Sequence, residues 1–104
     1  TIGSHGIDHI YYRFLSKKDC EKQLNDSKQK LEKIINKKVE YFAFPYGSFF
    51  ACSFENIKLA KRSSYKLAFS TIPEKIKNSF IFEKFFLPRI CVTSKYIKME
   101  LEKI

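Results

Sequence analysis

The sequence has few cysteines, no long apolar run and no recognisable nucleic-acid-binding motif. Its three cysteines, Cys20, Cys52 and Cys91, are far apart among 104 residues. An odd number of widely spaced cysteines matches neither a disulfide framework nor a C-x-x-C metal motif. We therefore expect ordinary thiols, in the core or at the surface.

No apolar run reaches about eighteen residues, and no charged segment followed by an apolar one is present, so neither a membrane span nor a signal peptide is visible. The chain begins at Thr1 without a methionine, and its most informative motif starts four residues later. We therefore expect further sequence before Thr1, and the missing leader does not exclude secretion. Internal repeats and low-complexity linkers are also absent, which predicts that residues 1–104 form a single, partial domain.

Hydrophobic residues make up 44% of the chain and aromatic residues 16%, enough to build a packed core. The net charge of +9 would suit nucleic acid, an anionic membrane surface or an acidic polymer. Many of the lysines fall within residues 17–38, which favours a solvated helix face. Helix-turn-helix, zinc-finger and RNA-recognition signatures are absent, so we do not expect a nucleic-acid partner.

The longest periodic segment runs from Ser16 to about Asn36. Ser16 is placed as a helix N-cap, with Asp19 at the third helical position. Behind it, apolar or small residues recur every three or four positions, which predicts an amphipathic helix of about five turns. These residues are Cys20, Leu24, Ser27, Leu31, Ile34 and Ile35.

Shorter elements follow. Residues 39–44 and 65–70 are predicted strands, and residues 55–63 a helix between them. Residues 80–86 are strongly apolar, Pro88 favours an extended edge segment through residue 92, and Ser94 is expected to cap a last helix that reaches residue 104. This order predicts parallel β/α units. Three or so strands cannot close a barrel, so we expect this chain to be part of a larger domain.

His5 and His9 are the only histidines, and they directly follow a short β-branched segment that suits the end of a strand. Two neutral imidazoles four residues apart can bind one metal ion about 2 Å from each nitrogen. A bare H-x-x-x-H pattern also occurs often by chance, so spacing alone leaves both interpretations open.

Pro45, Tyr46 and Gly47 lie at the carboxyl end of a predicted strand, the edge where active sites assemble in parallel β/α folds. Their backbone N–H groups could face a developing oxyanion, and Tyr46 could offer an aromatic wall to a sugar ring. A purely structural turn after a buried strand explains the same residues.

Taken together, these motifs resemble the polysaccharide deacetylase (NodB-homology) family. The resemblance rests on I-G-S-H-G-I-D-H at residues 2–9, F-A-F-P-Y-G at residues 42–47, residues 65–71 and L-P-R-I at residues 87–90, in that order. It implies a partial (β/α) barrel without its N-terminal strands. His5 and His9 would be ligands of a divalent metal, zinc or a similar ion, and the backbone N–H of Tyr46 would stabilise an oxyanion.

The same resemblance implies hydrolysis of N-acetyl or O-acetyl groups on a polysaccharide, with Pro45, Tyr46 and Gly47 contacting the substrate. Gly6 replaces the family's usual Ser or Thr, and Ala43 stands where many members have Arg. The family's Asp ligand, Asp base and late His are not found, so we expect this chain alone to be inactive. Asp8 would point away from a shared metal, and Arg89 is expected to hold a strand end by hydrogen bonds.

Two other functions remain possible: a carbohydrate-binding remnant without catalysis, and a basic nucleic-acid-binding module whose affinity would fall steeply with salt. A location in the bacterial cell envelope or outside the cell is suggested by the resemblance only.

Overall fold

A computed structural model describes residues 1–77 and 84–103. The elements are the 3-10 helix η1 (Tyr12–Phe14), α1 (Lys17–Ile35), β1 (Tyr41–Ala43), α2 (Phe54–Arg62), β2 (Leu67–Phe69) and α3 (Ser94–Leu101). From α1 onward they follow the predicted order, but η1 was not predicted and α3 ends at Leu101 instead of reaching residue 104. Among the described residues no helix is long and apolar enough to cross a membrane. Most of the apolar segment at residues 80–86 lies outside the described part of the chain.

The sheet is parallel throughout. β1 pairs with β2 in the register Tyr41 to Leu67. Isolated parallel bridges join Ser4 to Phe42 on one side and Phe69 to Leu87 on the other. Four successive segments therefore lie side by side in chain order and all run the same way, as the predicted β/α units require.

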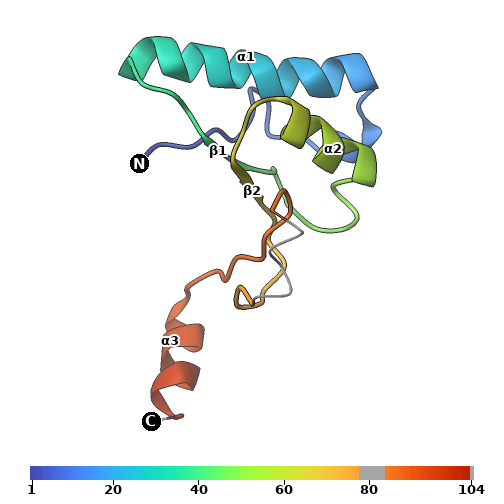
Figure 1. The fold of residues 1–104 in the computed structure, drawn as a ribbon. Coiled ribbons are helices and arrows are strands. Elements are labelled where there is room, and N and C mark those ends of the chain that lie inside the picture. Colours follow the sequence, from blue (N-terminus) through green and yellow to red (C-terminus); the bar gives the residue numbers. More distant parts are fainter. Residues whose placement is uncertain (78–83, 104) are drawn as a thin grey trace.

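Helix α1 begins and ends where the sequence predicted. The Ser16 side chain accepts a hydrogen bond from the Asp19 N–H, and Asn36 ends the helix in the left-handed conformation. Cys20, Leu24 and Ser27 are buried, but Ile34 is 79% exposed and does not belong to the core stripe as predicted. The last turns of α1 extend beyond α2 (Figure 1), although Leu31 and Ile35 in these turns still pack against the core.

The core lies between the sheet and the two helices α1 and α2, which lie on the same side of it (Figure 1). Phe42 points inward from the centre of β1, and its ring centroid lies 5.3 Å from that of Tyr65 and 5.9 Å from that of Tyr12. The Tyr65 hydroxyl donates to the carbonyl of Leu24 at 2.8 Å, so this buried polar group ties the sheet layer to α1.

The C-terminal helix α3 lies apart from α1 and α2 (Figure 1). Its N-cap is Thr93, whose side chain accepts from the Tyr96 N–H, so the prediction of Ser94 as the cap was wrong by one residue. Both hydroxyl residues can cap a helix, and the extended backbone of Thr93 decides between them. Cys20 and Cys52 are buried and Cys91 is exposed, as expected of ordinary thiols.

Candidate active site

His5 lies directly after the bridge that joins Ser4 to β1. The Ser4 N–H donates to the Tyr41 carbonyl and the Ala43 N–H donates to the Ser4 carbonyl. The Nδ1 atom of His5 lies 2.6 Å from the carbonyl oxygen of Ala43. A carbonyl only accepts, so Nδ1 donates, and in a neutral imidazole with this tautomer Nε2 has a lone pair for a Lewis acid. Metal-binding histidines are commonly oriented in this way by a backbone carbonyl.

Gln23 of α1 fixes the loop between the two histidines. Its Oε1 atom accepts from the N–H groups of Ile7 and Asp8 at 2.9 and 3.0 Å, and its Nε2 atom donates to Asp8 Oδ2 at 2.9 Å. Gln23 is only 8% exposed and lies on the buried stripe of α1. It was not predicted as a site residue, although a polar residue among the apolar positions of an amphipathic helix was the available signal.

The backbone conformation at residue 6 explains why Gly6 stands where the family usually has Ser or Thr. Its φ of +82° is left-handed, and a Cβ atom there would overlap the hydroxyl group of Tyr12. A glycine adopts a left-handed φ without steric cost, and it has no Cβ atom to overlap the Tyr12 hydroxyl. The conformation of the loop therefore depends on the residue that replaces the usual Ser or Thr.

The two imidazoles come close together, as their spacing allowed. Their ring centroids are 5.1 Å apart and their planes are inclined by 53°. In a tetrahedral site with metal–nitrogen distances of about 2.0–2.1 Å, two imidazole centroids lie about 5 Å apart. The centroid distance is therefore compatible with two ligands of one ion, and the Ala43 carbonyl orients the ring of His5.

No cluster of three or more His, Cys, Asp or Glu side chains that could hold a metal is found in residues 1–77 and 84–103. Asp8 is near the histidines in sequence, but Gln23 holds its carboxylate. It is therefore engaged elsewhere, as expected. A complete metal site would need further ligands from outside the described residues.

The Pro45-Tyr46-Gly47 segment is a tight turn at the carboxyl end of β1. Tyr46 and Gly47 both have left-handed backbones, with φ of 63° and 59°, and the Gly47 N–H donates to the Pro45 carbonyl at 2.7 Å. Thr71, after β2, fixes this turn from the other side. Its hydroxyl donates to the Tyr46 carbonyl at 2.6 Å, and its N–H donates to the Gly47 carbonyl at 2.9 Å.

Within the described residues no acceptor is found for the Tyr46 N–H. The Tyr46 side chain is 47% exposed, and its ring centroid lies 4.5 Å from that of His9. The turn thus places the ring of Tyr46 next to His9, and its N–H belongs to the same residue. Such a combination can bind an oxyanion and a sugar ring.

Arg89 follows the next segment of the sheet, and its Nε atom donates to the Ser70 carbonyl at 3.0 Å. Its own N–H donates to the Ile72 carbonyl at 2.9 Å. Arg89 therefore ties down the strand end, as expected. Ala43, at the position of the family's Arg, contributes the carbonyl oxygen that orients His5.

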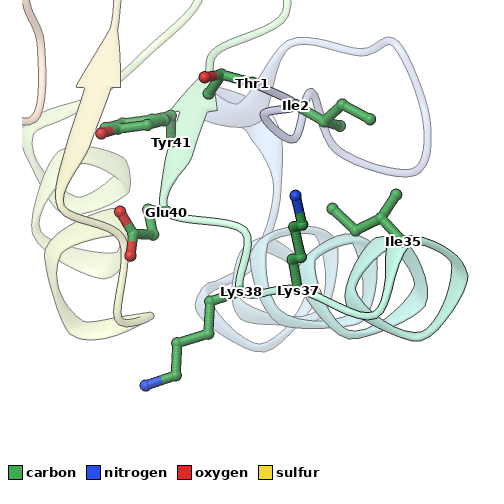
Figure 2. Close-up of a pocket in the computed structure, with 7 residues that line it drawn as sticks. All are labelled: Thr1, Ile2, Ile35, Lys37, Lys38, Glu40 and Tyr41. Atoms are coloured by element: carbon green, nitrogen blue, oxygen red, sulfur yellow. The ribbon is translucent and has the colours of Figure 1, made fainter.

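A separate hollow of about 450 Å³ lies at the opposite end of β1, and Figure 2 shows its lining residues. The side chain of Lys37 extends between Glu40 and Ile35, while that of Lys38 points away (Figure 2). None of the predicted site residues lines this hollow.

The same fold occurs in solved deacetylases. Streptococcus pyogenes deacetylase PplD, solved in complex with acetate, superposes with a TM-score of 0.83 at 22% identity, over 97% of this chain and 42% of that one. IcaB from Ammonifex degensii gives a TM-score of 0.79 at 18% identity, over 98% and 46%. BC0361, a polysaccharide deacetylase from Bacillus cereus, gives 0.77 at 24% identity, over 97% and 32%.

The chain thus spans less than half of the length of each of these structures. It corresponds to part of their barrel fold. No curated protein matches the sequence significantly. The sequence model of the polysaccharide deacetylase family matches residues 1–67, which include both histidines and the Pro-Tyr-Gly turn. The chain therefore belongs to the polysaccharide deacetylase family.

Proposed function

We propose that this chain is part of a metal-dependent deacetylase that acts on an acetylated polysaccharide. The bonds hydrolysed are those of N-acetyl groups, with O-acetyl groups as the alternative. The observation that carries the proposal is the histidine pair at the carboxyl end of a parallel sheet, with the ring of Tyr46 beside His9. The family match supports the reaction class.

In this proposal His5 and His9 hold the divalent ion, most simply zinc, through one nitrogen each. When bound, such an ion polarises the acetyl carbonyl and lowers the pKa of a bound water. The Ala43 carbonyl keeps His5 in the tautomer whose Nε2 is free to bind. The further ligand and the general base are carboxylates from outside the described residues.

Tyr46 has two roles in this proposal. Its backbone N–H donates to the oxygen that becomes negatively charged as the tetrahedral intermediate forms, and its ring packs against the sugar. Thr71 holds the carbonyls of Tyr46 and Gly47, and the Gly47 N–H holds that of Pro45, so the peptide group that carries the Tyr46 N–H is oriented before substrate binds. A donor that needs no reorganisation stabilises the transition state more than one that must first be ordered.

The zinc affinity of the chain, measured by calorimetry and elemental analysis, tests whether His5 and His9 bind a metal ion. We expect weak one-to-one binding that is lost in the His5→Ala, His9→Ala double variant. The matched control is Asp8→Asn, which changes a nearby carboxylate held by Gln23 and should leave zinc affinity unchanged. Equal zinc binding by the chain and the double variant would refute the assignment.

Acetate release from N-acetylated oligosaccharides tests the reaction. We expect none from this chain alone, because the general base lies outside it. Saccharide binding without zinc binding would instead favour a carbohydrate-binding remnant of the fold. The observation that favours this alternative is Ala43, which stands where many members of the family have Arg.

A further inference from the structure

A buried tyrosine, Tyr12, reaches back to the loop of residues 5–9, which we call the histidine loop. Its ring is fully buried and packs against Phe42 and Phe44, with centroids 5.9 and 6.1 Å away. Its carbonyl oxygen accepts from Asn56 Nδ2 of α2 at 3.2 Å, and its hydroxyl donates to Gln23 Oε1 of α1 at 3.3 Å. Tyr12 is therefore fixed against the sheet and against both helices.

Three donors converge on the oxygen of the Gln23 amide. They are the N–H groups of Ile7 and Asp8, at 2.9 and 3.0 Å, and the hydroxyl of Tyr12. An amide turned over would set its NH2 group against these donors, so the Tyr12 hydroxyl helps to hold the orientation that accepts from the loop. Burial raises the pKa of Tyr12, so its hydroxyl stays protonated and donates.

The Tyr12 hydroxyl also fills the space beside residue 6. A Cβ atom on Gly6 would overlap that hydroxyl, and it would lie 3.2 Å from Tyr12 Cζ and 3.3 Å from Gln23 Oε1. At this backbone conformation, a Ser or Thr side chain at residue 6 would begin where the Tyr12 hydroxyl lies. A hydroxyl next to Gln23 Oε1 can therefore be carried by residue 6 or by residue 12, but not by both.

A tyrosine that served only the core would not account for this arrangement. A phenylalanine fills the same space among the core rings, and a buried hydroxyl costs free energy unless it is hydrogen-bonded. The hydroxyl of Tyr12 is directed at the side chain that holds the backbone between the two histidines. The tyrosine at residue 12 and the glycine at residue 6 are thus explained together.

We propose that Tyr12 is a positioning residue of the histidine loop, and that its hydroxyl takes the place of the Ser or Thr side chain that the family usually has at residue 6. The ion that this loop binds rests on the proposed function. By holding the Gln23 amide, Tyr12 keeps the loop in the conformation in which the two imidazole centroids lie 5.1 Å apart. A loop ordered before the ion arrives loses less conformational entropy on binding, so zinc affinity should depend on this hydroxyl.

Tyr12→Phe removes the hydroxyl and keeps the ring. We expect the zinc affinity of the 104-residue chain, measured by calorimetry, to fall by about three- to tenfold. The matched control is Tyr65→Phe, because Tyr65 is also buried and its hydroxyl donates to the Leu24 carbonyl of α1 rather than to the loop. The control should lower Tm by a similar amount and leave zinc affinity within about twofold of that of the unaltered chain.

A double-mutant cycle tests whether one hydroxyl replaces the other. Gly6→Ser alone should lower zinc affinity by about tenfold or more, because the new Cβ meets the Tyr12 hydroxyl at a left-handed φ. In the Tyr12→Phe background the overlap with the hydroxyl is gone, and the serine hydroxyl can reach the Gln23 oxygen. The double variant should therefore bind zinc more tightly than Gly6→Ser alone, although both carry the cost of the left-handed φ.

Amide exchange of the metal-free chain, followed by NMR, separates this inference from the proposed function. The Ile7 and Asp8 N–H groups should exchange about three- to tenfold faster in Tyr12→Phe than in the unaltered chain, since both donate to the Gln23 oxygen. Their exchange should be unchanged in Tyr65→Phe, because an exposed loop opens locally rather than by global unfolding. A chain that does not bind zinc would defeat the proposed metal site, and the exchange rates would still test Tyr12.

Unchanged zinc affinity and unchanged loop exchange in Tyr12→Phe would overturn the proposal. Equal effects of Tyr12→Phe and Tyr65→Phe on the loop would also overturn it, because they would reflect a general loss of stability. If the effects of Gly6→Ser and Tyr12→Phe simply multiply in the double variant, the two residues act independently, and the replacement of one hydroxyl by the other is refuted.

Discussion

Gln23→Ala tests how the histidine loop is held. The substitution removes the acceptor for the Ile7 and Asp8 N–H groups and the donor to the Asp8 carboxylate. Each hydrogen bond contributes about 0.5–1.5 kcal/mol net, and the bond to the carboxylate somewhat more. Ile7 and Asp8 are exposed, so water replaces part of the loss there. The buried Tyr12 hydroxyl also donates to Gln23 Oε1, at 3.3 Å, and loses that acceptor, so we expect about 2 kcal/mol or more of destabilisation.

For a domain of this size, that loss corresponds to a fall in Tm of roughly 8–15 °C. Thermal unfolding followed by circular dichroism measures it. Zinc affinity should fall by about tenfold or more in the same variant, because Gln23 orients the loop that carries His9. The matched control is Gln29→Ala, an exposed position on the same helix, which should change stability by less than about 0.5 kcal/mol.

A second substitution, Gln23→Glu, separates the contribution of the Nε2 donor from that of the Oε1 acceptor. It keeps the acceptor for both N–H groups and places a carboxylate against the Asp8 carboxylate. The variant should be least stable near pH 7 and should recover as pH falls toward about 4, where the introduced carboxyl is protonated and can donate. An unchanged Tm in Gln23→Ala, or a Gln23→Glu variant that does not respond to pH, would refute this account of the loop.

Two further predictions concern the turn and the thiols. Gly47→Ala should destabilise the chain by about 2 kcal/mol or more in urea unfolding, because φ is +59° and the new Cβ would lie 2.7 Å from the Thr71 nitrogen; an unchanged midpoint would contradict the geometry of the turn. Burial raises the pKa of Cys20 to about 11 and that of Cys52 to about 12. At pH 8 a thiol reagent should therefore modify only the exposed Cys91 in the folded chain, and all three cysteines in urea. The stability due to the two neutral thiols should be complete below about pH 8.5, where the unfolded thiols begin to ionise, and should be lost as pH rises through about 9 to 12. Rapid modification of Cys20 or Cys52 at pH 8 without denaturant would show that burial does not protect them.

Local sequence determined most of the secondary structure. The Ser16 cap and the apolar stripe fixed α1 to within a residue at each end, because capping and helical periodicity involve only neighbours in the chain. The predicted strand at residues 39–44 is shorter, Tyr41–Ala43, although Val39 and Phe44 at its ends are buried as expected. A strand ends where its partners end, and the partners are distant in sequence.

The sequence by itself also predicted which residues form the candidate site. His5, His9 and the Pro45-Tyr46-Gly47 turn could be chosen because each follows a strand signal and together they match the order of a family motif. Their proximity follows from the parallel sheet, which brings the carboxyl ends of successive strands to one edge.

Only the tertiary structure decided how these residues are held and what lies beside them. The support of His5 by the Ala43 carbonyl, of the loop by Gln23 and of the turn by Thr71 all join positions at least 15 residues apart. Such contacts leave no periodic signal in the chain. Burial in the segment after the histidines is likewise not readable from residue type, because Tyr11 and Tyr12 are both tyrosines, and only packing determines that Tyr12 is fully buried and Tyr11 is exposed.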